Sequence, residues 1–151
     1  MSVIDIIGLD DPLAIAGVRV LDAPRDLVWK VWTDPKHLAQ WWGPNGFTST
    51  FETFDFRPGG AWKFVLHGPD GKNYPNVNRF VELVPAQRVR LQHVEGHWFE
   101  LTVTLTAEGE KTRIGWRQQF ANEEELLLVR DYVIPANEEN LDRLEAVLRS
   151  E

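Results

Sequence analysis

The side chains that could carry acid–base or nucleophilic chemistry in this sequence are few and form no catalytic motif. Cysteine is absent, and the three serines, Ser2, Ser49 and Ser150, lie outside any nucleophile motif. No pair of the remaining polar candidates has a spacing that demands catalysis, so the sequence predicts no catalytic residue and leaves enzymatic activity open. The candidates for a buried acid, a base or a polar anchor for a ligand are Tyr74, Arg79, Glu82, Tyr132 and Asn137.

Two histidines, His93 and His97, are four residues apart with Glu95 between them. On a helix this spacing would place both imidazoles on one face, where they could bind a metal ion. Gly96 and the alternating pattern around it indicate a hairpin instead, so the helical rule does not apply. We therefore predict a surface hairpin here, with no metal site and no cofactor.

Four of the seven tryptophans, Trp29, Trp32, Trp41 and Trp42, lie close together in the first third of the chain. Side chains of this size need large apolar partners, so this segment is expected to form the wall and lid of a pocket built by the rest of the chain. Plain core packing is the competing interpretation, and it is the stronger one for Trp41. Trp42 precedes a Gly-Pro turn and is the better candidate for a residue that gates a pocket.

Apolar periodicity and turn signals predict the secondary-structure elements that position these residues. Residues 1–15 are expected to be an extended lead-in that packs on a sheet edge. Val18–Leu21 is predicted to be a strand. Two short helices are expected after it, over Arg25–Thr33 and Lys36–Trp42, the second capped by the aspartate that precedes it.

Beyond these helices the apolar period changes to two, which indicates about six antiparallel strands between Phe47 and Phe120. A short helix over 122–130 and a longer amphipathic helix are expected to follow. Pro135 either starts the longer helix or kinks a continuous one, and the start is favoured. Strands linked by hairpins, with helices at defined places, are typical of an α+β domain.

A single curved sheet can bury one face only against another element, and the C-terminal helix is the only one long enough. With the two short helices closing one end, a cavity is expected between helix, sheet and lid. The strand 74–84 has ambiguous faces, because Val77 and Leu83 alternate out of phase with Phe80. The apolar residues expected to line the cavity are Val28, Trp32, Leu38, Trp42, Phe54, Trp62, Phe64, Val81, Leu91, Phe99, Leu101, Trp116 and Leu141. The polar residues expected to fix the polar ends of a ligand are Tyr74, Arg79, Tyr132 and Asn137.

The chain of 151 residues is expected to form one domain over 1–151. Its composition limits the classes of partner that it is expected to bind. The net charge is -7 and the Lys and Arg residues are scattered, which argues against nucleic acid or an anionic membrane. No apolar run approaches the ~20 residues of a membrane-spanning helix, and no signal peptide is visible, so a cytoplasmic protein is expected. The expected partner is an apolar or aromatic small molecule. A homodimer through an outer face or edge of the sheet is compatible with the sequence.

A set of short motifs follows in order along the chain. The motifs are Asp22-Ala23-Pro24, Trp32-Thr33-Asp34-Pro35, Trp41-Trp42-Gly43-Pro44, Arg57-Pro58-Gly59-Gly60, Gly68-Pro69-Asp70-Gly71, Val81-Glu82-Leu83-Val84-Pro85 and Leu141-Asp142-Arg143-Leu144. Over Val18 to Leu148 this set resembles the activator of heat-shock-protein-90 ATPase homologue family, which belongs to the START-like (SRPBCC) helix-grip superfamily. The resemblance implies a strongly bent antiparallel sheet around a long C-terminal helix, two short helices after the first strand, and a hydrophobic ligand cavity.

Proteins that share this scaffold bind lipids or hormones, act as polyketide cyclases or dehydratases, or serve as co-chaperone domains. We therefore expect a small-molecule binding protein. A cyclase-, dehydratase- or hydrolase-like enzyme is one alternative. An interaction module for a heat-shock ATPase is another, ranked lower because this chain is acidic and the full co-chaperone has a further N-terminal domain.

Two departures from the family pattern affect the expected cavity. The family's Gly-Trp near the start of the last helix is replaced by the sequence of residues 132–137. The usual glycine of the fourth strand is replaced by Asn78 or Arg79. The second change would narrow the pocket or place a polar anchor in it.

Overall fold

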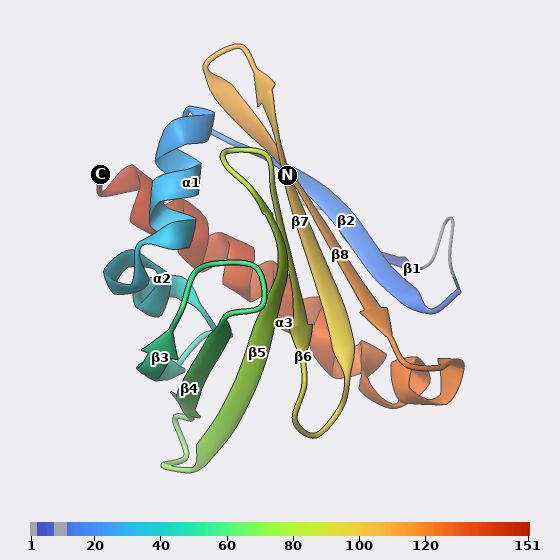
Figure 1. Cartoon of the computed structure of the whole chain (residues 1–151). Coiled ribbons are helices and arrows are strands. Elements are labelled where there is room, and N and C mark those ends of the chain that lie inside the picture. The colour runs from blue at the N-terminus through green and yellow to red at the C-terminus, as the bar shows by residue number, and fades with distance from the viewer. Residues whose placement is uncertain (1–2, 8–11) are drawn as a thin grey trace.

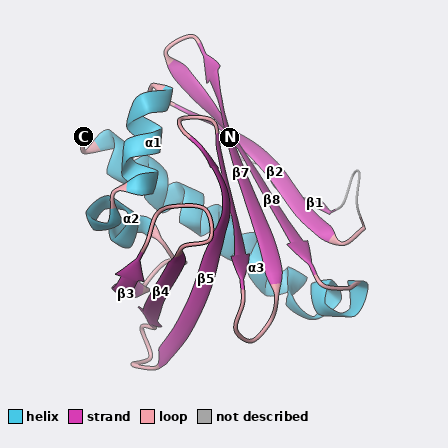
Figure 2. Cartoon of the chain, in the orientation of Figure 1, coloured by secondary structure: helices cyan, strands magenta, loops and turns pink. Residues whose placement is uncertain are grey.

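The computed structural model describes residues 3–7 and 12–151, which form one eight-stranded antiparallel sheet and three helices (Figures 1 and 2). The strands lie in the order β1-β2-β8-β7-β6-β5-β4-β3. In chain order the elements are β1 (Val3–Ile7), β2 (Ala14–Leu21), α1 (Arg25–Thr33), α2 (Pro35–Trp41), β3 (Thr48–Phe54), β4 (Ala61–His67), β5 (Asn73–Val84), β6 (Arg88–His93), β7 (Phe99–Glu108), β8 (Lys111–Phe120) and α3 (Glu123–Arg149).

The long helix α3 runs across one face of the curved sheet, and its C-terminal end lies beside α1 and α2 (Figure 1). The predicted apolar stripe of this helix, Leu141, Leu144 and Leu148 with Val147 beside them, is buried. Burial of one such side chain contributes about 1.5–3 kcal/mol relative to exposure, so the stripe attaches the helix firmly to the sheet. The predicted α+β arrangement, with a curved antiparallel sheet around a long C-terminal helix, is confirmed.

Helix α3 continues through Pro135, so the predicted start of a second helix at this residue is wrong. Pro135 and Asp131 are both exposed, and water can replace the hydrogen bond that the proline removes from the Asp131 carbonyl group. The first half of the helix is held by Leu126, which is buried against β2 and β8. Its start is capped by Asn122, whose Oδ1 accepts a hydrogen bond from the Glu125 backbone N–H at 2.9 Å.

The helices α1 and α2 follow the second strand of the sheet and not the first, because residues 3–7 form the edge strand β1. The next strand, β2, begins earlier than predicted, at Ala14, and both Ala14 and Ile15 are buried. The extended lead-in predicted for residues 1–15 therefore contains an edge strand and the start of β2. Its residues 1, 2 and 8–11 lie outside the described part of the chain.

The turn between β3 and β4 depends on two glycines. Gly59 has a φ of 83°, in the left-handed region that favours glycine. A side chain at Gly60 would collide with the backbone carbonyl group of Asp55. The Gly59 N–H donates to the carbonyl oxygen of Phe80 at 2.7 Å, and the Phe80 N–H donates to that of Gly60 at 3.0 Å. These bonds join the turn to β5.

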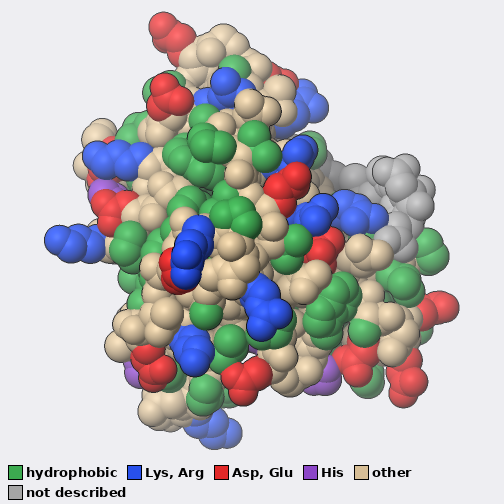
Figure 3. Space-filling model, in the orientation of Figure 1, with side chains coloured by type: hydrophobic (Ala, Val, Ile, Leu, Met, Phe, Trp, Pro, Cys, Tyr) green, Lys and Arg blue, Asp and Glu red, His purple; other side chains and the backbone are tan. Residues whose placement is uncertain are grey.

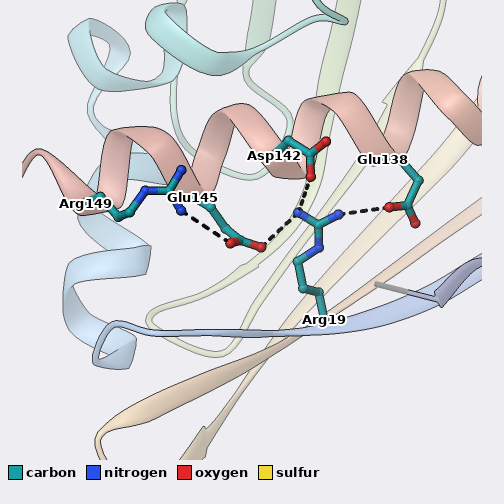
Figure 4. A network of polar contacts seen from close by, with 5 residues as sticks. All are labelled: Arg19, Glu138, Asp142, Glu145 and Arg149. Carbon is teal, nitrogen blue, oxygen red and sulfur yellow. Dashed lines mark hydrogen bonds and ion pairs between the residues drawn. The ribbon is translucent and has the colours of Figure 1, made fainter. Parts of the chain in front are cut away.

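Arg19 on β2 links the sheet to α3 through three carboxylates (Figure 4). Its side chain is almost completely buried, and its guanidinium group donates to Glu138 at 2.9 Å, Asp142 at 2.8 Å and Glu145 at 2.9 Å. The spacing of these three acidic residues places them on one face of the helix. The network therefore fixes the position of α3 over the sheet.

The surface seen in Figure 3 mixes both signs of charge, with Lys and Arg side chains interspersed among Asp and Glu. No helix among the described residues is both long and apolar enough to cross a membrane.

Candidate functional site

A cavity lies between the sheet and the middle of α3. Its deeper part, named here the inner chamber, has a volume of about 210 Å³. Strand residues, including Phe64, Asn78 and Trp116, form its floor, and α3 contributes Ala136 and Asn137 to its roof. The inner chamber is thus the space that remains between α3 and the sheet.

The inner chamber adjoins a wider part of the cavity, named here the outer vestibule, with a volume of about 780 Å³. Tyr74, His97 and Glu139 border the outer vestibule only. Pockets that hold small ligands have comparable volumes, of about 300–1,000 Å³. The residues that border both parts are Pro44, Leu66, Asn76, Tyr132 and Ala136.

Trp42 forms the aromatic wall between the inner chamber and the hydrophobic core. Its side chain is 8% exposed, and its ring centroid lies 4.8 Å from that of Trp62 and 5.6 Å from that of Trp32 in the core. The centroid of Trp116, which also borders the chamber, is 6.1 Å away. These contacts make Trp42 a fixed wall, with the tilted and edge-on geometries that aromatic pairs prefer.

The segment that follows α2 is tied to α3 by hydrogen bonds. Arg143 donates from Nη1 to the carbonyl oxygens of Gly43 at 2.8 Å and Pro44 at 3.0 Å, and from Nη2 to that of Gln40 at 2.9 Å. The Gly43 N–H donates to Oδ1 of Asn140 at 2.9 Å. Because Gly43 has a φ of 111°, a residue with a side chain would be strained there. These bonds hold the wall of the chamber in place.

The polar groups that border the inner chamber are mostly uncharged amides. No Asp, Glu, Lys or Arg side chain borders it within residues 3–7 and 12–151. Asn137 donates from Nδ2 to Oε1 of Gln118 at 3.1 Å. Asn78 is 1% exposed, yet neither Nδ2 nor Oδ1 has a hydrogen-bond partner among the described residues, and the same holds for the indole Nε1 of Trp116. The chamber therefore combines apolar walls with unused donors and an unused acceptor.

His93 also borders the inner chamber, at the end of β6. Its ring stacks on Phe99 with centroids 4.9 Å apart. Nδ1 donates to the carbonyl oxygen of His97 at 2.6 Å, and Nε2 lies 2.9 Å from Oδ1 of Asn76. Burial is the main cause that lowers the pKa of His93 below its ordinary value.

The residues predicted to line a cavity fall into three groups. Those that border the inner chamber are Trp42, Phe64, Phe99, Leu101, Trp116, Tyr132 and Asn137, and Tyr74 borders the outer vestibule. Those that lie fully buried in the core, outside the chamber wall, are Val28, Trp32, Leu38, Trp62, Leu91 and Leu141. Phe54 is partly buried and packs against the same core.

The third group, Arg79 and Val81, does not border the cavity. Arg79 is exposed, and its neighbour Asn78 faces inward, so the expectation that Arg79 anchors a ligand in the cavity is corrected. Val81 is half-buried and borders neither part of the cavity. A register shift between Phe80 and Glu82 changes the alternation of β5, which explains why its faces were ambiguous in the sequence.

Sequence reasoning missed His93 and Gln118 as residues of the site, although a signal for both was present. The alternation that places Val89 and Leu91 inside continues to His93 on β6. In the same way, the alternation through Trp116 leads to Gln118 on β8, which is buried. The predicted surface hairpin is confirmed for residues 94–98, which are exposed, whereas His93 at its start is partly buried.

Glu82 lies away from the chamber and pairs with Arg88, whose Nε donates to Glu82 Oε1 at 2.7 Å. This hydrogen bond is the main cause that lowers the pKa of the Glu82 carboxyl group below its ordinary value. A carboxylic acid that donates a proton near neutral pH would need the opposite shift. No group of three or more His, Cys, Asp or Glu side chains in the described part of the chain is placed to hold a metal ion.

The curved antiparallel sheet and the long C-terminal helix that it grips define a helix-grip protein. A sequence model of the Activator of Hsp90 ATPase homolog 1-like protein family matches residues 22–149. The chain belongs to this family, as the ordered motifs of the sequence predicted. No curated protein matches the chain.

Solved structures support the same fold. A protein from Arthrobacter aurescens is 26% identical, with a TM-score of 0.86 over 92% of this chain and 87% of that one. A protein from Rhodobacter sphaeroides is 21% identical, with a TM-score of 0.86 over 97% of this chain and 98% of that one. An AHSA1-like protein from Aeromonas hydrophila is 16% identical, with a TM-score of 0.72 over 91% and 92% of the two chains.

Proposed function

We propose that this protein binds an apolar or aromatic small molecule between α3 and the sheet. The observation that carries the proposal is the inner chamber, which has aromatic walls and adjoins the outer vestibule. Transfer of apolar ligand surface from water into such a chamber is favourable by about 25 cal/mol per Å². Wall residues that are already fixed by Arg143 and Asn140 would lose little further freedom when a ligand binds.

The enzymatic alternative has less support than binding. No carboxylate borders the inner chamber in the described part of the chain, and Glu82 lies outside it with a lowered pKa. An acid–base reaction would need a proton donor or acceptor matched to the working pH. Membership of the family is compatible with small-molecule binding but names no ligand.

A pair of alanines on α3 offers a matched test of the proposal. Ala136 borders both parts of the cavity, whereas Ala146 is exposed on the same helix. Ala136→Phe would fill the space, and Ala146→Phe would add the same group at the surface. We expect the wild-type protein and Ala146→Phe to bind naphthalene in a saturable way, with quenching of tryptophan fluorescence, and Ala136→Phe to bind at least about tenfold more weakly.

Circular dichroism of each variant would verify that the fold is retained. The proposal fails if naphthalene and a panel of larger aromatic and aliphatic probes show no saturable binding to the wild-type protein. It also fails if a folded Ala136→Phe variant binds the probe as well as Ala146→Phe does.

A further inference from the structure

Asn78 is an unusual residue for the floor of an aromatic chamber. It lies on β5 between Trp62 and His93, its partners on the neighbouring strands, and is 1% exposed. Both polar atoms of its carboxamide lack a hydrogen-bond partner within the described residues. A buried amide in this state destabilises the folded protein, because its hydrogen bonds to water are lost and not replaced.

The other amide side chains that border the inner chamber make their hydrogen bonds elsewhere. Asn137 and Gln118 pair with each other at 3.1 Å. Asn76 donates from Nδ2 to the carbonyl oxygen of Tyr74 at 2.8 Å, and its Oδ1 lies 2.9 Å from Nε2 of His93. The carboxamide of Asn78 is thus left with donors and an acceptor for a group that enters the chamber.

The charge of that group is limited by the lining of the chamber. Among the described residues, no Asp, Glu, Lys or Arg side chain borders the chamber. An ionised ligand group beside Asn78 would be taken out of water without an ion-pair partner, which is strongly unfavourable. An uncharged ligand avoids this cost and still makes hydrogen bonds.

We propose that the inner chamber selects an uncharged aromatic molecule with a hydrogen-bond donor and an acceptor side by side on one edge, and that Asn78 recognises this edge. The cis-amide of an aromatic lactam is the simplest group of this kind. Its N–H donates to Oδ1 of Asn78 while its carbonyl oxygen accepts from Nδ2. The aromatic body lies against the walls formed by Trp42, Phe64 and Trp116. This inference rests on the proposed function, because it specifies the chemistry of the same cavity.

Three bicyclic probes of similar shape separate the two hydrogen bonds from apolar burial. 2-Quinolone carries the donor and the acceptor, 1-methyl-2-quinolone carries the acceptor alone, and naphthalene carries neither. Calorimetry with the wild-type protein is expected to show 2-quinolone binding at least about tenfold more tightly than either of the others. This comparison needs no variant.

Two leucine variants then test the role of Asn78. Asn78→Leu keeps a side chain of similar size but removes both polar atoms, and we expect it to lose the preference for 2-quinolone while it still binds naphthalene. Its melting temperature without ligand should rise, because an unsatisfied buried amide is removed. Arg79→Leu places the same side chain on the exposed face of the same strand and should keep the preference of the wild-type protein.

The possible failures are distinguishable. If the wild-type protein binds all three probes equally, the role of Asn78 is wrong while the proposed binding function stands. The role is also wrong if Asn78→Leu keeps the preference for 2-quinolone, or if this variant melts at a lower temperature than the wild type. If the wild-type protein binds none of the three probes or of the wider panel, the proposed function itself fails.

Discussion

Asn137 on α3 donates a hydrogen bond from Nδ2 to Oε1 of Gln118 on β8, over 3.1 Å. Both side chains are buried, and both border the inner chamber. This bond joins the gripped helix to the sheet at the site itself. Two amides of the chamber are thus bonded to each other, whereas Asn78 has no hydrogen-bond partner among the described residues.

The Asn137–Gln118 bond should make a measurable contribution to stability. Asn137→Leu or Gln118→Leu alone leaves one buried amide without its partner and should lower the free energy of unfolding by about 1–3 kcal/mol. The double variant should lose clearly less than the sum of the two single variants, because no amide is left unpaired. Urea denaturation of the four proteins measures this coupling. Strictly additive losses would show that the bond contributes nothing.

The Arg19 network should contribute more to stability than an ion pair at the surface. Arg19→Met removes the shared partner of Glu138, Asp142 and Glu145 and should lower the free energy of unfolding by about 2 kcal/mol. This value lies below that of a fully buried pair, because the carboxylates are partly exposed.

The control for this prediction is Arg57→Met, which breaks the exposed pair between Arg57 and Asp55. We expect a loss of at most about 1 kcal/mol there. Equal losses for Arg19→Met and Arg57→Met in urea denaturation would contradict the role given to the network in holding α3.

His93 should make stability depend on pH. Burial lowers its pKa in the folded protein, with a smaller lowering from the charge of His97, while the hydrogen bond to the His97 carbonyl group and the charge of Glu95 act in the opposite direction. The unfolded chain therefore binds a proton more readily than the folded protein does. Stability should fall as the pH drops from the ordinary histidine pKa, about 6.5, through the lowered pKa of the folded protein.

The variant His93→Gln removes this titration and leaves the other three histidines unchanged. The free energy of unfolding, measured by urea denaturation from about pH 8 to about pH 5, should decline less steeply for this variant than for the wild type. Parallel curves for the two proteins would mean that burial of His93 does not oppose its protonation.

Local patterns in the sequence predicted the elements whose periodicity is regular. Helix α1 occupies Arg25–Thr33 as predicted, because an apolar stripe and a following Asp-Pro pair define both its face and its end. The alternation of β7 from Phe99 likewise gave a strand with the expected buried side. Trp42 was expected to gate a pocket because it stands beside a Gly-Pro turn, but its packing on Trp32 and Trp62 makes it a fixed wall residue instead.

The features that local patterns could not predict depend on contacts distant in the sequence. The register shift near Phe80 reverses which residues of β5 face inward, and only pairing with β6 produces it. The continuity of α3 through Pro135 depends on packing of Leu126 against strands far away in the chain. Likewise, the absence of a hydrogen-bond partner for Asn78 among the described residues can be recognised only when the partners of the other amides are known.

The central claim is that a small molecule binds in the inner chamber, and the indole N–H signals of the seven tryptophans test it most directly. Trp42 and Trp116 border the chamber, whereas Trp98 is partly exposed away from both parts of the cavity. In a ¹H–¹⁵N NMR titration with 2-quinolone, we predict saturable shifts of the Trp42 and Trp116 signals, with the Trp98 signal unmoved. Saturable shifts confined to Trp98, or no saturable shift of any indole signal with 2-quinolone, naphthalene or the wider panel of probes, would contradict the claim.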